Sequence, residues 1–191
     1  SSCWYNIQQR TSSYYYYYTM IDFTKFDFKN IFGVVKMTDG LKRNQTRTLR
    51  SELQEKAIAK YSDGQLEYVG DSENGRDFYG LNDELYYESK AMDGMFCKRK
   101  PTTKEITLKN FQGRNKGLPD KTFDYMLLWD TKTYTAGICS WDACMKNTVV
   151  KDAVISFRVD FDDITFFAND VDPIDKGDFS IKLDNLISES I

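Results

Sequence analysis

Histidine is missing from the 191-residue chain, and proline is scarce, with only three residues. Without histidine the chain lacks the most common general base, the most frequent metal ligand and every Ser/His or Cys/His catalytic arrangement. The composition, 41% apolar and 29% charged, does not fit a disordered or collagen-like chain. A chain of this length can bury its own core, and no repeat or linker divides it. The sequence therefore predicts a single domain over residues 1–191.

A strong excess of charge of one sign is also missing, because 26 basic residues face 29 acidic ones and leave a net charge of -3. Such a chain has no overall field that would attract nucleic acid or an anionic membrane. No apolar stretch is long enough for a signal peptide or a membrane span, and the chain begins with Ser1 instead of methionine, as a mature or trimmed chain would. We therefore expect no nucleic-acid partner and no membrane span.

The four cysteines form an even set without zinc-site spacing, because no C-x2-C pair and no histidine accompany them. Two disulfides are the simpler interpretation. The spacing of Cys139 and Cys144 allows a local bridge, which would leave Cys3 to pair with Cys97. Four buried free thiols are the alternative. Asn44 begins an Asn-Gln-Thr glycosylation sequon in a polar stretch, and together these features predict a secreted, extracellular glycoprotein.

Turn signals such as Asp-Gly and Asn-Gly interrupt the chain at short intervals, as they do between the strands of a meander. Residues 154–161 alternate strictly between apolar and polar side chains, which predicts a half-buried strand. Residues 125–129 and 134–141 flank a tight turn and predict a hairpin, and further strands are expected at 106–108 and 179–183. The sequence therefore predicts an all-β, mainly antiparallel fold, either a meander barrel or a sandwich, with one or two short helices.

Residues 46–61 follow a different pattern, with apolar side chains every four residues and Glu52 placed four residues before Lys56. This pattern predicts an amphipathic helix, and a strand pair turning at 63–64 is the alternative. A second short helix is expected near residues 185–190.

Aromatic residues are abundant, with 13 tyrosines, 13 phenylalanines and three tryptophans. Five consecutive tyrosines at 14–18 would place rings on both faces of one strand, so one face must meet a second sheet, a subunit, a ligand or a partner protein. In residues 15–23 the side chains of one strand face fall on odd-numbered positions, whereas Phe26 and Phe28 fall on even-numbered positions. This change predicts a bend near residues 24–25.

Acidic residues gather in turns at 71–77 and 170–178, but neither segment has the ligand spacing of an EF-hand. We expect these turns to be solvated and to hold no metal. A two-carboxylate glycosidase would need no histidine. Its candidate acids would be Glu84, Glu88 and Asp124. Acids are common in this chain, so the presence of such candidates does not by itself indicate a glycosidase. The prediction is a protein without enzymatic activity or cofactor.

The segment 123–129, with its Asp124-Tyr125 step, followed by a turn and residues 134–139, resembles the late strand pair of the lipocalins. The length, the two inferred disulfides and the spacing of the turns are similar to secreted arthropod members of that family. The resemblance implies an eight-stranded up-and-down barrel. The mouth of such a barrel takes a small apolar or amine ligand, or its outer face binds a partner protein.

In such a barrel the ligand would contact the aromatic side chains that point inward. The alternative is that these side chains fill a dry interior and bind no ligand. These candidate ligand-binding residues are Tyr15, Tyr17, Tyr125, Trp129, Phe157 and Phe161. The leading hypothesis is a secreted carrier or scavenger of a small, largely apolar ligand. The alternative is a secreted β-sandwich that acts as a protein-binding or immune-modulating module through a tyrosine-rich face.

Overall fold

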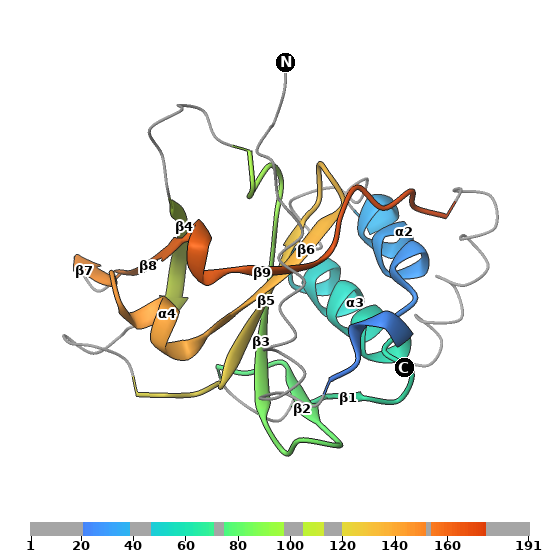
Figure 1. The fold of residues 1–191 in the computed structure, drawn as a ribbon, viewed down its shortest axis with the longest axis horizontal. Coiled ribbons are helices and arrows are strands. Elements are labelled where there is room, and N and C mark those ends of the chain that lie inside the picture. Colours follow the sequence, from blue (N-terminus) through green and yellow to red (C-terminus); the bar gives the residue numbers. More distant parts are fainter. Residues whose placement is uncertain are drawn as a thin grey trace.

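The computed structural model describes residues 21–38, 47–70, 75–97, 105–112, 120–151 and 154–174 (Figure 1). Its helical elements are η1 (Phe23–Lys25), α2 (Phe28–Thr38), α3 (Arg47–Lys60), α4 (Trp141–Met145) and η2 (Phe161–Asp163). Its strands are β1 (Leu66–Tyr68), β2 (Phe78–Gly80), β3 (Tyr86–Met92), β4 (Glu105–Gln112), β5 (Tyr125–Asp130), β6 (Thr135–Ser140), β7 (Val149–Lys151), β8 (Val154–Asp160) and β9 (Thr165–Ala168).

These strands form two sheets. The larger is six-stranded, in the order β1-β2-β3-β5-β6-β9, and the smaller is three-stranded, in the order β4-β8-β7. All neighbouring strands are antiparallel except β3 and β5, which run parallel. Parallel neighbours need a crossover, and here the chain leaves the larger sheet after β3, forms β4 in the smaller sheet and returns as β5.

The β-rich prediction is confirmed, but the all-β meander barrel is wrong for the part of the chain that the structure describes. The six-stranded sheet is open, with β1 and β9 at its two ends, and it mixes parallel and antiparallel pairs. The predicted hairpin is present as β5 and β6, which pair from Tyr125–Ser140 to Asp130–Thr135. The helix expected at 46–61 is present as α3, so the alternative strand pair is wrong.

Helix α2 was not predicted, because the two phenylalanines at its start were assigned to a strand that continued past a bend. The predicted bend coincides with η1, after which Asp27 caps α2 by accepting hydrogen bonds from the backbone of Asn30 and Ile31. Apolar residues then follow at helical spacing and are buried, namely Ile31, Phe32 and Val35.

The six-stranded sheet is covered on both faces, by α2 and α3 on one side and by α4 and the three-stranded sheet on the other (Figure 1). We call the two packed layers the helix-side core and the sheet-side core. The helix-side core includes Phe32, Ile58, Tyr87, Leu127 and Trp129. The sheet-side core includes Met126, Leu128, Cys139, Cys144, Phe157 and Val159.

Strand β5 shows why its sequence is a continuous apolar run. Leu127 and Trp129 point into the helix-side core, whereas Met126 and Leu128 point into the sheet-side core, and all four side chains are fully buried. A strand buried on both faces needs apolar residues at every position. Burial of each leucine contributes roughly 1.5–3 kcal/mol to the stability of the fold.

Several predicted features lie outside the described residues. They are the tyrosine run at 14–18, Cys3, Asn44, the strand expected at 179–183 and the helix expected near 185–190.

Candidate functional site

The predicted ligand-binding residues do not come together in one place. Trp129 and the half-buried Tyr125 lie on the helix side of the six-stranded sheet, where Tyr125 stacks on Tyr87 with 6.0 Å between ring centroids. Phe157 is buried in the sheet-side core, and the half-buried Phe161 packs against the same core. The sheet therefore separates these two pairs of residues. Tyr15 and Tyr17 lie outside the described residues.

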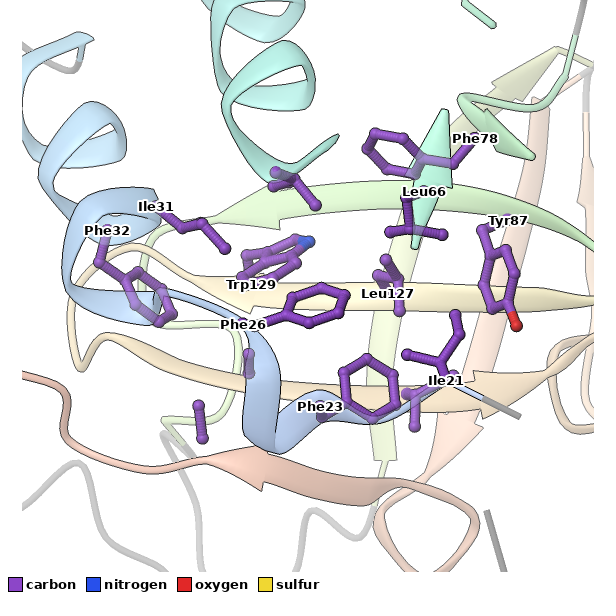
Figure 2. Close-up of a cluster of buried hydrophobic side chains, with 14 of the residues drawn as sticks. Ile21, Phe23, Phe26, Ile31, Phe32, Leu66, Phe78, Tyr87, Leu127 and Trp129 are labelled. Carbon is purple, nitrogen blue, oxygen red and sulfur yellow. The ribbon is translucent and has the colours of Figure 1, made fainter. Parts of the chain in front are cut away.

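Trp129 lies at the centre of the helix-side core, among Phe26, Ile31 and Leu127 (Figure 2). The rings of Phe28, Phe32 and Phe167 surround its indole, with centroid distances of 6.4, 5.7 and 5.8 Å. The indole Nε1 is buried and has no hydrogen-bond acceptor among the described residues. Buried Trp N–H groups usually find a partner, so this position could donate a hydrogen bond to a bound water or ligand.

Asp130 follows Trp129 and is the fully buried carboxylate at the end of β5. Its Oδ1 accepts hydrogen bonds from the backbone N–H groups of Gly94, Lys132 and Thr133 at 2.9–3.2 Å. Its Oδ2 accepts one from the N–H of Phe96 at 3.0 Å. These four bonds fasten the turn after β3 to the β5–β6 hairpin, and we assign Asp130 a structural role.

Cys139 and Cys144 are both fully buried in the sheet-side core, and their Sγ atoms lie 3.7 Å apart. The bridge predicted between them is therefore not formed in this structure, which holds the pair as two thiols in contact. The predicted partner of Cys97, Cys3, lies outside the described residues.

The clearest surface feature is a group of half-buried side chains on β2 and β3, which we call the tyrosine patch and define as Arg76, Tyr79 and Tyr86. Tyr79 and Tyr86 are direct partners in the β2–β3 register, and their ring centroids are 5.2 Å apart. The guanidinium of Arg76 lies 3.9 Å from the centroid of the Tyr86 ring. Phe78 and Tyr87 point into the helix-side core, so alternation places the two patch tyrosines on the opposite face.

The surroundings of the tyrosine patch are acidic. Desolvation and the nearby side chains of Glu84, Tyr86, Asp83 and Glu67 raise the pKa of Tyr79 above its ordinary value. Leu81 follows β2 directly and is 51% exposed. The patch therefore combines two aromatic rings and one guanidinium within an acidic region.

Beside the tyrosine patch, Asp77 and Glu88 form a pair of hydrogen-bonded carboxyl groups, which we call the carboxyl pair. Asp77 also accepts a hydrogen bond from the backbone N–H of Ser89 at 2.8 Å, whereas Glu88 Oε2 is buried without a partner among the described residues. Burial and the facing Asp77 raise the pKa of Glu88 to about 10. Burial also raises the pKa of Asp77. The pair thus shares one proton at neutral pH.

The carboxyl pair corrects the expectation that the acids at 71–77 are all solvated, because Asp77 is partly buried and bonded to Glu88. Of the other acids considered as catalytic candidates, Asp124 accepts a hydrogen bond from the N–H of Tyr86 and pairs with Lys121. Glu84 is exposed in the β2–β3 turn. No sequence signal joins Asp77 to Glu88, because the two residues meet only through the pairing of β2 with β3.

No protein-family model, curated protein or solved structure matches the chain. Within the described ranges, no group of three or more acidic or cysteine side chains is arranged to hold a metal ion. In the same part of the chain, no helix is long and apolar enough to cross a membrane.

Proposed function

We propose that this chain is a non-enzymatic recognition protein that binds a partner protein through the tyrosine patch on β2 and β3. The observation that carries the proposal is the contact of Tyr79, Tyr86 and Arg76 on the face opposite to the helices. Tyrosine and arginine are enriched among the residues that contribute most to protein–protein affinity, because each offers a large contact area together with a polar group. Leu81, which is exposed and lies two residues after Tyr79, offers a partner a further apolar side chain.

The charges around the tyrosine patch favour a partner with a basic contact segment. Glu67, Asp83 and Glu84 raise the pKa of Tyr79 and contribute three negative charges close to this ring. Lysine and arginine side chains of a partner would be attracted by these carboxylates and would stack on the tyrosine rings.

The proposal keeps the expected extracellular setting. A secreted chain would carry a glycan at Asn44. Expression behind an added signal peptide in a secretory eukaryotic host is expected to yield a glycosylated chain in the medium, and Asn44→Gln should remove the glycan and increase the electrophoretic mobility. Retention of the wild-type chain in the cell without a glycan would contradict this part of the proposal.

An array of synthetic peptides tests the binding surface. The peptides have the same apolar residues and differ in whether Lys/Arg or Asp/Glu surrounds them, and binding is measured by fluorescence anisotropy. Basic peptides should bind, and the double substitution Tyr79→Ala and Tyr86→Ala should weaken their binding at least tenfold, as expected for aromatic contact residues. Val149→Ala, at an exposed position of the three-stranded sheet, is the matched control. Equal binding of basic and acidic peptides, or full binding by the double variant, would contradict the proposal.

A small-ligand carrier is the second candidate, and the unpartnered indole N–H of Trp129 is the observation that favours it. A small apolar or amine molecule with a hydrogen-bond acceptor would satisfy this group within the helix-side core. Solvent extraction of the purified protein followed by mass spectrometry should then detect a copurified molecule. Trp129→Phe, which keeps an aromatic ring and removes the N–H, should reduce its amount, whereas an empty extract from the wild-type protein would exclude this candidate.

A further inference from the structure

Cys139 and Cys144 lie where helix α4 packs against strand β6, a place that we call the corner. Cys139 lies near the end of β6 in the six-stranded sheet, and Cys144 lies in α4, which packs against β6 and β8. Both side chains are fully buried, and the Sγ–Sγ distance of 3.7 Å allows either thiol to donate to the other. The two sulfur atoms therefore already face each other in the reduced protein.

The corner is held by hydrogen bonds that do not involve the sulfur atoms. Ser140 caps α4 by accepting a bond from the N–H of Ala143 at 3.1 Å. Thr148 donates to the carbonyl oxygen of Cys144 at 2.7 Å. Because these bonds fix the backbone on both sides of α4, the separation of the two cysteines is a property of the fold and not of one flexible side chain.

The geometry points to a reversible dithiol–disulfide couple at Cys139 and Cys144, which closes by exchange with a small-molecule disulfide such as oxidised glutathione. One thiolate attacks the external disulfide, forms a mixed disulfide and releases one thiol. The second thiolate then displaces the other half of the external disulfide. Two S–H bonds are lost and one S–S bond forms. The two electrons and two protons pass to the external disulfide, which leaves as two thiols.

The environment of the pair determines when this exchange occurs. Contact with Cys144 and burial raise the pKa of the Cys139 thiol, so the closed corner holds little reactive thiolate. Exchange therefore takes place while the two cysteines are exposed to solvent, during folding or local unfolding. Once formed, the bond is buried and protected from external thiols, and it ties β6 of the larger sheet directly to α4. This inference does not rest on the tyrosine patch.

Tryptic mapping isolates this pair from the other two cysteines. Cleavage after Lys132 and Lys146 releases residues 133–146 as one peptide that contains both Cys139 and Cys144, whereas Cys97 falls in the peptide 91–98. The reduced, purified chain is incubated with oxidised glutathione in mild denaturant, returned to native buffer, alkylated with iodoacetamide and digested without reductant. The expected product is a 133–146 peptide that is two hydrogen atoms lighter than the reduced form and carries no alkyl group.

The variants separate the possible pairings. Cys97→Ala should leave the mass loss of peptide 133–146 unchanged, whereas Cys144→Ser should replace it with one glutathione or alkyl adduct on Cys139. The oxidised wild-type chain should also unfold at a higher urea concentration than the reduced chain. Adducts on both cysteines of the wild-type peptide, a cross-link between peptides 133–146 and 91–98, or equal unfolding midpoints would overturn the inference.

Discussion

Buried acids are bonded differently at two places in the six-stranded sheet, at the end of β5 and between β2 and β3. At the end of β5, the carboxylate of Asp130 accepts hydrogen bonds from four backbone N–H groups. Between β2 and β3, the carboxyl pair of Asp77 and Glu88 has one backbone donor, from Ser89, and one oxygen without a partner. The number of donors decides the role of each acid. A fully bonded carboxylate stabilises the fold, whereas a sparsely bonded pair retains a proton and makes stability depend on pH.

The largest effect is expected at the end of β5, for Asp130→Ala. This change leaves four backbone N–H groups without their acceptor in a buried position, and it should lower the free energy of unfolding by about 3–5 kcal/mol. Urea unfolding followed by circular dichroism measures the change. Asp120→Ala, at an exposed position, is the control and should change stability by less than about 0.5 kcal/mol. A similar small loss for both variants would show that the four bonds are not structural.

Close packing between β6 and the start of β9 is tested by Gly137→Ala on β6. A Cβ at this position would lie 2.8 Å from the Cγ2 atom of Ile164 and 3.2 Å from the carbonyl oxygen of Thr165. Overpacking of this kind should cost about 1–3 kcal/mol in thermal or urea unfolding. The loss should shrink in an Ile164→Ala background, because the clashing methyl group is then absent. Additive effects of the two changes would contradict the close contact.

The carboxyl pair is tested by Glu88→Gln and the pH dependence of stability. The pKa of Glu88 rises from 4.5 to about 10 in the folded chain, so the folded chain binds more protons than the unfolded chain between these values. The free energy of unfolding should therefore fall as the pH rises from about 5 to 10, by at most about 1.4 kcal/mol per pH unit. Glutamine keeps a hydrogen-bond donor toward Asp77 and does not titrate, so the variant should show a flatter profile.

Urea unfolding at several pH values measures this profile. Glu67→Gln, at an exposed position of β1, is the matched control and should retain the wild-type slope. Identical slopes for wild type and Glu88→Gln would mean that the carboxyl pair does not hold a proton.

The smallest effect on stability is expected for Leu81→Ser, because this side chain is 51% exposed after β2. The free energy of unfolding should change by less than about 0.5 kcal/mol. If the tyrosine patch binds a partner, the same variant should weaken binding of basic peptides in the anisotropy assay. A large loss of stability would show that Leu81 belongs to the core and not to the recognition surface.

The fold was predictable where the signals are local. Helix α3 has apolar side chains at four-residue spacing, and the β5–β6 hairpin combines two apolar segments with a tight turn. Both elements were therefore predicted correctly. Helix α2 has an equally local signal, with Asp27 as its cap and Ile31, Phe32 and Val35 at helical spacing. Our prediction missed it because Phe28 was assigned to a bent strand on the basis of parity alone.

The candidate site was not predictable. Tyr79 and Tyr86, and likewise Asp77 and Glu88, belong to different segments and meet through the pairing of β2 with β3. The predicted ligand-binding residues were grouped by parity within separate strands, but parity does not say which sheet a strand joins. For that reason Trp129 and Phe157 were expected around one cavity and lie in two different cores.

By itself the sequence determined that the chain has no histidine-based chemistry, and it determined the positions of α3, β5, β6 and β8. These properties depend on composition and on the local period of apolar residues. Only the tertiary structure decided the parallel pairing of β3 with β5, the contact of Cys139 with Cys144 and the carboxyl pair. The reason is that a side-chain period specifies which face is buried, whereas the choice of neighbouring strand depends on the burial and hydrogen bonding of the whole chain.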